Sequence, residues 1–214
     1  MAQIYLSEVK LLENERNAKE ALDGVDPLRR EEAAKVKDVK KKAQILTAGL
    51  LLQHGAREFL GDKAPAGIYN VAVEEGGKPY FTDIEGVYFS ISHSADMALC
   101  AISDVRVGAD IQQRREIRSD IAGRFFHPDE TEFLRKLSVN ESEKAFFDLW
   151  CLKESYVKFT GGGLSQGLDE LDFTPVLGGG FAVFEFTENG SRIRAELVDA
   201  PHGYSAAVIE EVRS

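Results

Sequence analysis

Asp110 and Gln112 offer two oxygen ligands on one side of a predicted strand. The stretch VRVGADIQ, Val105 to Gln112, has the period of a strand, so that Gly108, Asp110 and Gln112 share one face. Oxygen ligands at i and i+2 on a rigid strand suit a hard cation such as Mg²⁺, which takes one or two carboxylates and completes its shell with water and substrate phosphate. A solvent-facing strand with a polar edge explains the same pattern, so both interpretations stay open.

A helix further along the chain carries charge beside an aromatic side chain. In LWCLKESYVKFTGGG, Trp150, Glu154 and Lys158 are spaced four apart and therefore lie along one side of the helix. A surface Glu-Lys pair is the simplest interpretation. If Trp150 faces the interior, however, the carboxylate and the ammonium lie at the margin of the core, where each needs a partner. A metal ion for Glu154 and a phosphate for Lys158 would supply both.

Two further segments offer contacts for an anion. Ser92 and His93 end the predicted strand FSISHS, and His93 as a cation would bind phosphate well, although a core histidine is an equal alternative. Lys78 lies on the tight turn GGKP, which lacks the spacing of a Walker loop. The absence of a GxSxG elbow argues against a hydrolase of that type.

The predicted elements indicate an α+β fold in two similar subdomains, residues 1–103 and 104–214. Each places helices on a mostly antiparallel sheet, and a ligand site between the halves would be the natural consequence. One predicted helix begins at Asp26-Pro27, and the others are Lys41–Leu60, Arg118–Phe126, Pro128–Leu137 and Asn140–Thr160. The predicted strands are Ala2–Val9, five short runs from Gly67 to Gln112, and the runs LDFTPV, FAVFEF, RIRAELV and GYSAAVIEEV.

Composition restricts the class of function. The formal charge of −10 argues against sequence-independent binding of nucleic acid, which depends on a basic surface. The first residues lack a basic start and a long apolar run, so we expect a cytoplasmic protein. Cys100 and Cys151 are expected to be buried and reduced. The basic run from Leu28 to Lys42 is either a solvated helix face or a wall for a polyanionic ligand.

The order of these segments resembles the 4′-phosphopantetheinyl transferase superfamily, in the larger, surfactin-synthetase-activating form. The resemblance rests on GKPYF, SISHS, VGADIQ, RFFHPDE and above all the W-x-x-K-E-S-x-x-K helix, and it extends from about Leu28 to Asp172. The small holo-acyl-carrier-protein-synthase form is trimeric and about half as long. This chain is similar to the fused, monomeric form, whose two halves are related by pseudo-two-fold symmetry.

The resemblance implies a transferase that moves the 4′-phosphopantetheine group of coenzyme A to a serine of an apo acyl or peptidyl carrier protein and releases 3′,5′-ADP. It implies Mg²⁺ as the cofactor and Glu154 as the candidate general base, with Glu130 as a lesser candidate. By motif match the metal ligands would be Asp110, Glu154 and Gln112. Lys158 and Lys153 would contact the pyrophosphate. The contacts on the 3′-phosphate side of the nucleotide would be Ser92, His93, Lys78 and Arg29.

The chain departs from the family pattern at a few positions. Gln112 stands where the surfactin-synthetase type usually has glutamate, and Glu32 and Gln44 stand where basic residues are common. Two alternatives therefore stay open: a non-catalytic module that binds coenzyme A or a carrier protein, and a metal-dependent nuclease or nucleotidyl transferase built on the same acids. We expect the carrier protein to dock near the segment from Arg114 to Phe126.

Overall fold

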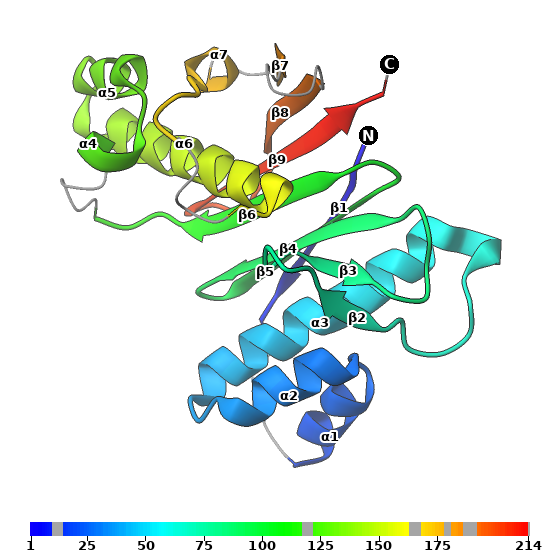
Figure 1. The fold of residues 1–214 in the computed structure, drawn as a ribbon. Helices are drawn as coiled ribbons and strands as arrows, with labels where there is room; N and C mark the ends of the chain where they lie inside the picture. The colour runs from blue at the N-terminus through cyan, green and yellow to red at the C-terminus, as the bar shows by residue number, and fades with distance from the viewer. Residues whose placement is uncertain (10–14, 117–121, 163–167, 178–180, 186–191, 214) are drawn as a thin grey trace. The chain divides into compact units, whose positions relative to one another are not determined.

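The computed structural model describes residues 1–9, 15–116, 122–162, 168–177, 181–185 and 192–213. The chain forms two compact units, Met1–Val107 and Gly108–Ser214 (Figure 1). The second unit therefore begins inside the strand that carries Asp110. None of the helices in the described ranges combines the length and apolar character needed to cross a membrane.

The first unit packs one long helix on a three-stranded antiparallel sheet of order β1-β5-β4, with β2 and β3 forming a separate antiparallel pair. Its elements are β1 (Gln3–Glu8), α1 (Glu15–Asp23), α2 (Pro27–Lys35), α3 (Val39–Leu60), a short 3₁₀ turn η1 (Gly61–Lys63), β2 (Val71–Val73), β3 (Pro79–Phe81), β4 (Tyr88–Ser94) and β5 (Met97–Ser103).

Local signals in the sequence explain where the helices of this unit begin and end. Asp26 caps α2 by accepting from the backbone N–H of Arg29, with Pro27 at the first helical position. Asp38 caps α3 by accepting from the backbone N–H of Lys41 at 2.7 Å. The 22-residue α3 ends at Gly61, whose φ of 55° favours glycine. Both helices were predicted from the sequence, whereas α1, a short polar helix, was not.

The second unit repeats this plan. Its elements are β6 (Val107–Gln113), α4 (Ala122–Phe125), α5 (Pro128–Arg135), α6 (Val139–Thr160), α7 (Thr174–Leu177), β7 (Phe181–Glu185), β8 (Arg192–Val198) and β9 (Tyr204–Val212). The sheet has the order β6-β9-β8-β7. Its core gathers one face of α6 with residues of α5, α7, β8 and β9, including Leu149, Leu152, Phe173, Ile193 and Ile209.

The two units share one chain topology. Each begins with a strand, continues through short helices into a 22-residue helix, and returns to the sheet so that its last strand pairs with its first. The predicted α+β class, with helices packed on mostly antiparallel sheets, is confirmed (Figure 1). The pseudo-two-fold relation between the halves stays a prediction.

One predicted strand is wrong. The run LDFTPV, Leu171 to Val176, continues into the helical turn α7 and forms no strand. Asp172 accepts from the backbone N–H of Thr174 at 2.9 Å and from its hydroxyl at 2.8 Å, an arrangement that starts a helix. The run is predicted as a strand, but an aspartate two residues before Thr174-Pro175 favours a helix start.

The structure also places the remaining predicted segments. Cys100 and Cys151 are both free and buried, as predicted. The predicted helix Arg118–Phe126 is observed from Ala122, and residues 117–121 lie outside the described residues. The same holds for residues 163–167 of the glycine-rich run after α6 and for the last residue of FAVFEF.

Candidate active site

Asp110 lies at the centre of a small polar cluster in the second unit. Its side chain is buried on β6, with the residue 2% exposed. One carboxylate oxygen accepts from Lys158 Nζ at 2.7 Å, and the other accepts from Gln112 Nε2 at 2.9 Å. Asp110 and Gln112 therefore point the same way from the strand, as its alternation predicts.

The face of β6 that carries Asp110 is covered by α6, so the interpretation as a solvent-facing strand is wrong. Gly108, two residues before Asp110, lies directly under the helix backbone. A β-carbon added at Gly108 would lie 2.1 Å from the carbonyl oxygen of Ser155 and 2.4 Å from the backbone nitrogen of Phe159. Only glycine permits this close approach, which brings Asp110 within reach of Lys158.

Hydrogen bonds hold α6 against the sheet. Cys151 Sγ donates to the carbonyl of Ser205 at 3.1 Å, and Ser155 Oγ donates to the carbonyl of Ala207 at 3.0 Å. The two side chains are one helical turn apart, and both carbonyls belong to β9. The face of α6 that meets the sheet is thus fixed by directional contacts as well as by apolar packing.

Glu154 adds a second carboxylate to the cluster. Its side chain is half-buried, and burial raises the pKa of Glu154 above its ordinary value. The negative charge of Asp110 raises that pKa further, while the Lys158 ammonium partly opposes the shift. The two carboxylates thus lie close enough to repel each other, and one ammonium lies near them, so additional positive charge would be favourable at this site.

Trp150 explains why charge and an aromatic ring share one side of α6. Its ring packs near Phe125 and Phe126, with ring centroids 5.9 and 6.5 Å apart, and is partly buried against the core of the second unit. This side of α6 runs from the core at Trp150 to the half-buried Glu154 and Lys158. The interpretation as a fully solvated Glu-Lys pair is therefore excluded.

Lys78, Ser92 and His93 all lie in the first unit. Lys78 is buried, its Nζ donates to the carbonyl of Val107 at 2.8 Å, and burial together with the charge of Arg106 lowers its pKa to about 7. Ser92 is buried and His93 is exposed at the end of β4, which excludes the alternative of a core histidine.

The pKa of Lys78 makes a testable contribution to stability. Between its folded value of about 7 and its ordinary value of 10.5, the unfolded chain holds a proton that the folded chain has released. The free energy of unfolding should therefore rise with pH across this window, by up to about 1.4 kcal/mol per pH unit from this residue. We expect Lys78→Met to lose that rise in urea unfolding measured at pH 7, 8 and 9. The exposed Lys63→Met should keep the wild-type slope, and equal slopes for wild type and Lys78→Met would refute the assignment.

Arg29 and the two departures around it have structural partners. Arg29 forms an ion pair with Glu32 one turn along α2, so part of its charge is neutralised within the helix. Gln44 Nε2, on α3, donates to the carbonyl of Ala95 at 2.8 Å, in the turn that follows β4. Of the two departures, Glu32 therefore pairs within α2, and Gln44 joins α3 to the turn after β4.

The structure gives Lys153 and Glu130 partners that differ from the predicted ones. Both residues are fully buried, and Lys153 Nζ lies 2.9 Å from Glu130 Oε2. Successive helical residues point roughly 100° apart, so Lys153 faces the interior while its neighbour Glu154 faces the margin of the core. A phosphate contact at Lys153 and a general base at Glu130 would both need access that these side chains lack. The sequence HPDE could have indicated a structural role for Glu130, since this residue completes a capping box at the start of α5.

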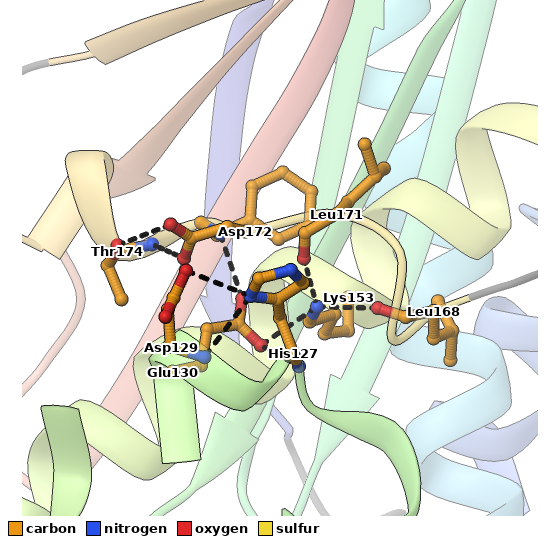
Figure 2. Close-up of polar contacts among 9 residues, drawn as sticks. His127, Asp129, Glu130, Lys153, Leu168, Leu171, Asp172 and Thr174 are labelled. Atoms are coloured by element: carbon orange, nitrogen blue, oxygen red, sulfur yellow. Dashed lines mark hydrogen bonds and ion pairs between the residues drawn. The ribbon is translucent and has the colours of Figure 1, made fainter. Parts of the chain in front are cut away.

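His127, Asp129 and Asp172 form a cluster that the sequence did not predict. One possible ligand atom from each lies within 4.8 Å of the others (Figure 2). Both Asp172 oxygens accept from Thr174, and His127 Nδ1 accepts from the backbone N–H of Asp129. These atoms cap the helices α7 and α5, which explains why they gather here.

Comparison with known proteins shows which family the chain resembles in sequence. The family model of the 4′-phosphopantetheinyl transferase superfamily matches residues 106–209. The 4′-phosphopantetheinyl transferase psf-1 of Bacillus pumilus is 31% identical over 72% of this chain and 67% of its own length. The 4′-phosphopantetheinyl transferase Sfp of Bacillus subtilis strain 168 is 31% identical over 72% of this chain and 66% of its own length. A further 4′-phosphopantetheinyl transferase of Bacillus subtilis is 37% identical over 58% of this chain and 54% of its own length.

The match to psf-1 extends over two thirds of that relative's length at 31% identity, which shows the family of this chain. The chain belongs to the 4′-phosphopantetheinyl transferase superfamily. It matches between about half and two thirds of the length of the three relatives named above.

Proposed function

We propose that this chain transfers the 4′-phosphopantetheine group of coenzyme A to a serine of an apo acyl or peptidyl carrier protein. The observation that carries the proposal is the cluster of Asp110, Glu154 and Lys158, which lies within the span that matches the family model. Two carboxylates beside one ammonium suit a reaction that needs charge neutralised at a pyrophosphate.

The donor set fits a divalent metal ion, for which we propose Mg²⁺. Asp110 and Glu154 supply hard carboxylate oxygens, and Gln112 could supply a carbonyl oxygen once its amide turns away from Asp110. Burial and the negative charge of Asp110 raise the pKa of Glu154, and a bound cation would favour the ionised form of both carboxylates. When bound, Mg²⁺ would neutralise charge on the pyrophosphate oxygens.

The chain's own residues would orient the donor and accept a proton. In the reaction the serine hydroxyl oxygen forms a bond to the β-phosphorus, and the bond from that phosphorus to the bridging oxygen breaks. The bridging oxygen leaves with 3′,5′-ADP. Lys158, at 29% side-chain exposure, can turn from Asp110 to contact a pyrophosphate oxygen. Glu154, half-buried at the margin of the core, is our candidate to accept the serine proton.

We retain Lys78, Ser92 and His93 as proposed contacts on the 3′-phosphate side of the nucleotide. His93 is exposed at the end of β4, so its imidazole is accessible to a phosphate group. Arg29 is a weaker candidate because Glu32 already pairs with it. Lys153 cannot contact a phosphate and Glu130 cannot act as the base, because both side chains are fully buried.

Superfamily membership implies coenzyme A as donor and a carrier protein as acceptor. We propose a cytoplasmic monomer, in keeping with the two like units within one chain. Carrier docking near Arg114 to Phe126 also stays a prediction, and residues 117–121 of that segment lie outside the described residues.

One assay tests the transferase. The protein is incubated with coenzyme A, Mg²⁺ and each of several apo acyl and peptidyl carrier proteins, and the intact carrier is weighed by mass spectrometry. We expect the mass of one phosphopantetheine group on at least one carrier, and no adduct when the acceptor serine is changed to alanine. If all carriers stay unmodified while the protein still binds coenzyme A, the non-catalytic alternative replaces this proposal.

Gln112 gives a second prediction, on metal affinity. In Gln112→Glu the hydrogen bond to Asp110 is replaced by a third carboxylate, so the site gains negative charge. We expect transfer activity to reach half its maximum at a lower Mg²⁺ concentration, by about tenfold, equivalent to about 1.4 kcal/mol. The neighbouring variant Gln113→Glu, also on β6, should leave the Mg²⁺ titration unchanged because Gln113 is outside the proposed donor set. A titration of Gln112→Glu that overlays that of the wild type would contradict the prediction.

A further inference from the structure

Glu130 on α5 and Lys153 on α6 form an ion pair inside the core of the second unit. Lys153 Nζ lies 2.9 Å from Glu130 Oε2, and neither side chain is more than 1% exposed. The ammonium also donates to the carbonyl of Leu168 at 2.6 Å and to that of Leu171 (Figure 2). A lysine ammonium has three donors, so all three have partners.

Both oxygens of the Glu130 carboxylate also accept hydrogen bonds from the main chain. Its Oε2 accepts from the backbone N–H of His127 at 2.9 Å, and its Oε1 accepts from the backbone N–H of Phe173 at 2.8 Å. Lys153 Nζ also lies 5.2 Å from the centre of the Phe173 ring. The network thus joins three pieces of chain: the first turn of α5, the middle of α6 and the segment 168–173 before α7 (Figure 2).

Stability alone does not account for a charged pair at this place. Burial raises the pKa of Glu130 and lowers that of Lys153, and the attraction between the two groups opposes both shifts. Apolar side chains of similar volume often stabilise a core as well as a buried ion pair does. The pair adds directional hydrogen bonds to main-chain atoms, which fix the geometry of the segments they join.

Lys153 is covalently next to Glu154, so the two side chains move together when α6 rotates. A rotation that carried the Glu154 carboxylate away from Asp110 would pull Lys153 from its acceptors on α5 and in segment 168–173. Where α6 packs on the sheet, Cys151 and Ser155 donate hydrogen bonds to main-chain carbonyls of β9. The helix is therefore held by polar contacts to two different parts of the unit.

We propose that the Glu130–Lys153 pair is a positioning element of the transferase site, which holds α6 in the rotation that presents Glu154 beside Asp110. This inference rests on the proposed function of Glu154 and Asp110. Neither member of the pair touches substrate. Their role is to keep the Glu154 carboxylate close to that of Asp110, because small displacements of a catalytic group cost much of the rate.

The test is the double variant Glu130→Gln/Lys153→Met, which removes both buried charges together and so leaves neither one unpaired. We expect a folded protein with kcat for transfer lowered about 10- to 100-fold, a higher half-saturating Mg²⁺ concentration, and an unchanged KM for the apo carrier. The matched control, Glu132→Gln/Lys136→Met, makes the same changes in an exposed ion pair at 3.3 Å and should keep the wild-type values. A folded double variant with wild-type kcat and Mg²⁺ dependence overturns the inference.

A second variant covers the case in which the double variant does not fold. Glu130→Asp keeps both charges and shortens the link by one methylene, so we expect a loss of kcat in the same direction and of smaller size. A Glu130→Asp protein that is folded and as active as the wild type would likewise overturn the inference.

Direct metal binding separates this inference from the proposed function. Mn²⁺ is titrated into the apo protein with coenzyme A present, and free Mn²⁺ is followed by electron paramagnetic resonance. The Glu130→Gln/Lys153→Met variant should bind Mn²⁺ about tenfold more weakly than the wild type and the control, equivalent to about 1.4 kcal/mol. Equal binding overturns the inference. If the wild type modifies no carrier, the proposed function fails, and this titration still decides the positioning role.

Discussion

Gly108→Ala is expected to destabilise the second unit by about 3 kcal/mol or more, the largest effect on stability that we foresee. The added methyl group would lie 2.1 Å from the Ser155 carbonyl oxygen and 2.4 Å from the Phe159 backbone nitrogen. Both atoms belong to the main chain of α6, so no side-chain rotation can relieve the overlap. The helix must move away from β6, which would also separate Lys158 from Asp110. Urea unfolding and transfer activity should therefore both be impaired.

Gly123→Ala is the matched control for this prediction. Gly123 lies on α4, and a β-carbon added there would meet nothing within 4 Å. Alanine is the better helix former, so this variant should be neutral or more stable by up to about 1 kcal/mol. If Gly108→Ala proved as stable as Gly123→Ala, the close approach of α6 to β6 would be refuted.

Glu154→Gln is expected to lower kcat/KM for carrier modification by about 10³-fold, the largest effect on activity. Glutamine keeps the shape of the side chain but removes the charge that would hold Mg²⁺ and accept the serine proton. The fold should not suffer, because the raised pKa of Glu154 means that folding penalises its ionised form. That penalty applies above the folded pKa and vanishes as the pH falls and the carboxyl is protonated.

Two measurements check the Glu154 prediction together. At pH 7 the free energy of unfolding of Glu154→Gln should equal or exceed that of the wild type, and the advantage should shrink toward pH 4.5. Glu143→Gln, the same change near the start of α6, should leave activity unchanged. A Glu154→Gln protein that is folded and fully active would remove Glu154 from the mechanism, whereas a less stable one would show that Glu154 serves the fold.

The sequence located most elements of the fold because their signals are local. Asp-Pro and Asp38 mark helix starts, and the strands of the first unit follow from short apolar runs separated by turns. It failed at α7, where LDFTPV was predicted as a strand and the capping role of Asp172 was missed, and at α1, whose residues are mostly polar. Alternation is a weak signal over a few residues, and a cap needs only one side chain to decide the local structure.

The residues of the site follow the same division between local and tertiary information. Spacing alone put Asp110 and Gln112 on one face of a strand, and Trp150, Glu154 and Lys158 on one side of a helix, because these periods are properties of the backbone. Spacing did not say which face is covered, and so it left a polar strand edge and a surface ion pair as alternatives. The tertiary structure excluded both, because α6 passes over Gly108 and brings Lys158 to Asp110.

Lys153 and Glu154 are the clearest example of what only the tertiary structure decided. Their types and positions in the W-x-x-K-E-S-x-x-K helix are determined by the sequence, which makes both candidates for contact with a charged ligand. Packing then separates them, since Lys153 is enclosed with Glu130 in the core while Glu154 is half-buried near Asp110. The physical reason is that a buried ammonium is tolerated only where distant parts of the chain bring it a carboxylate and carbonyls, and those partners come together only in the folded unit.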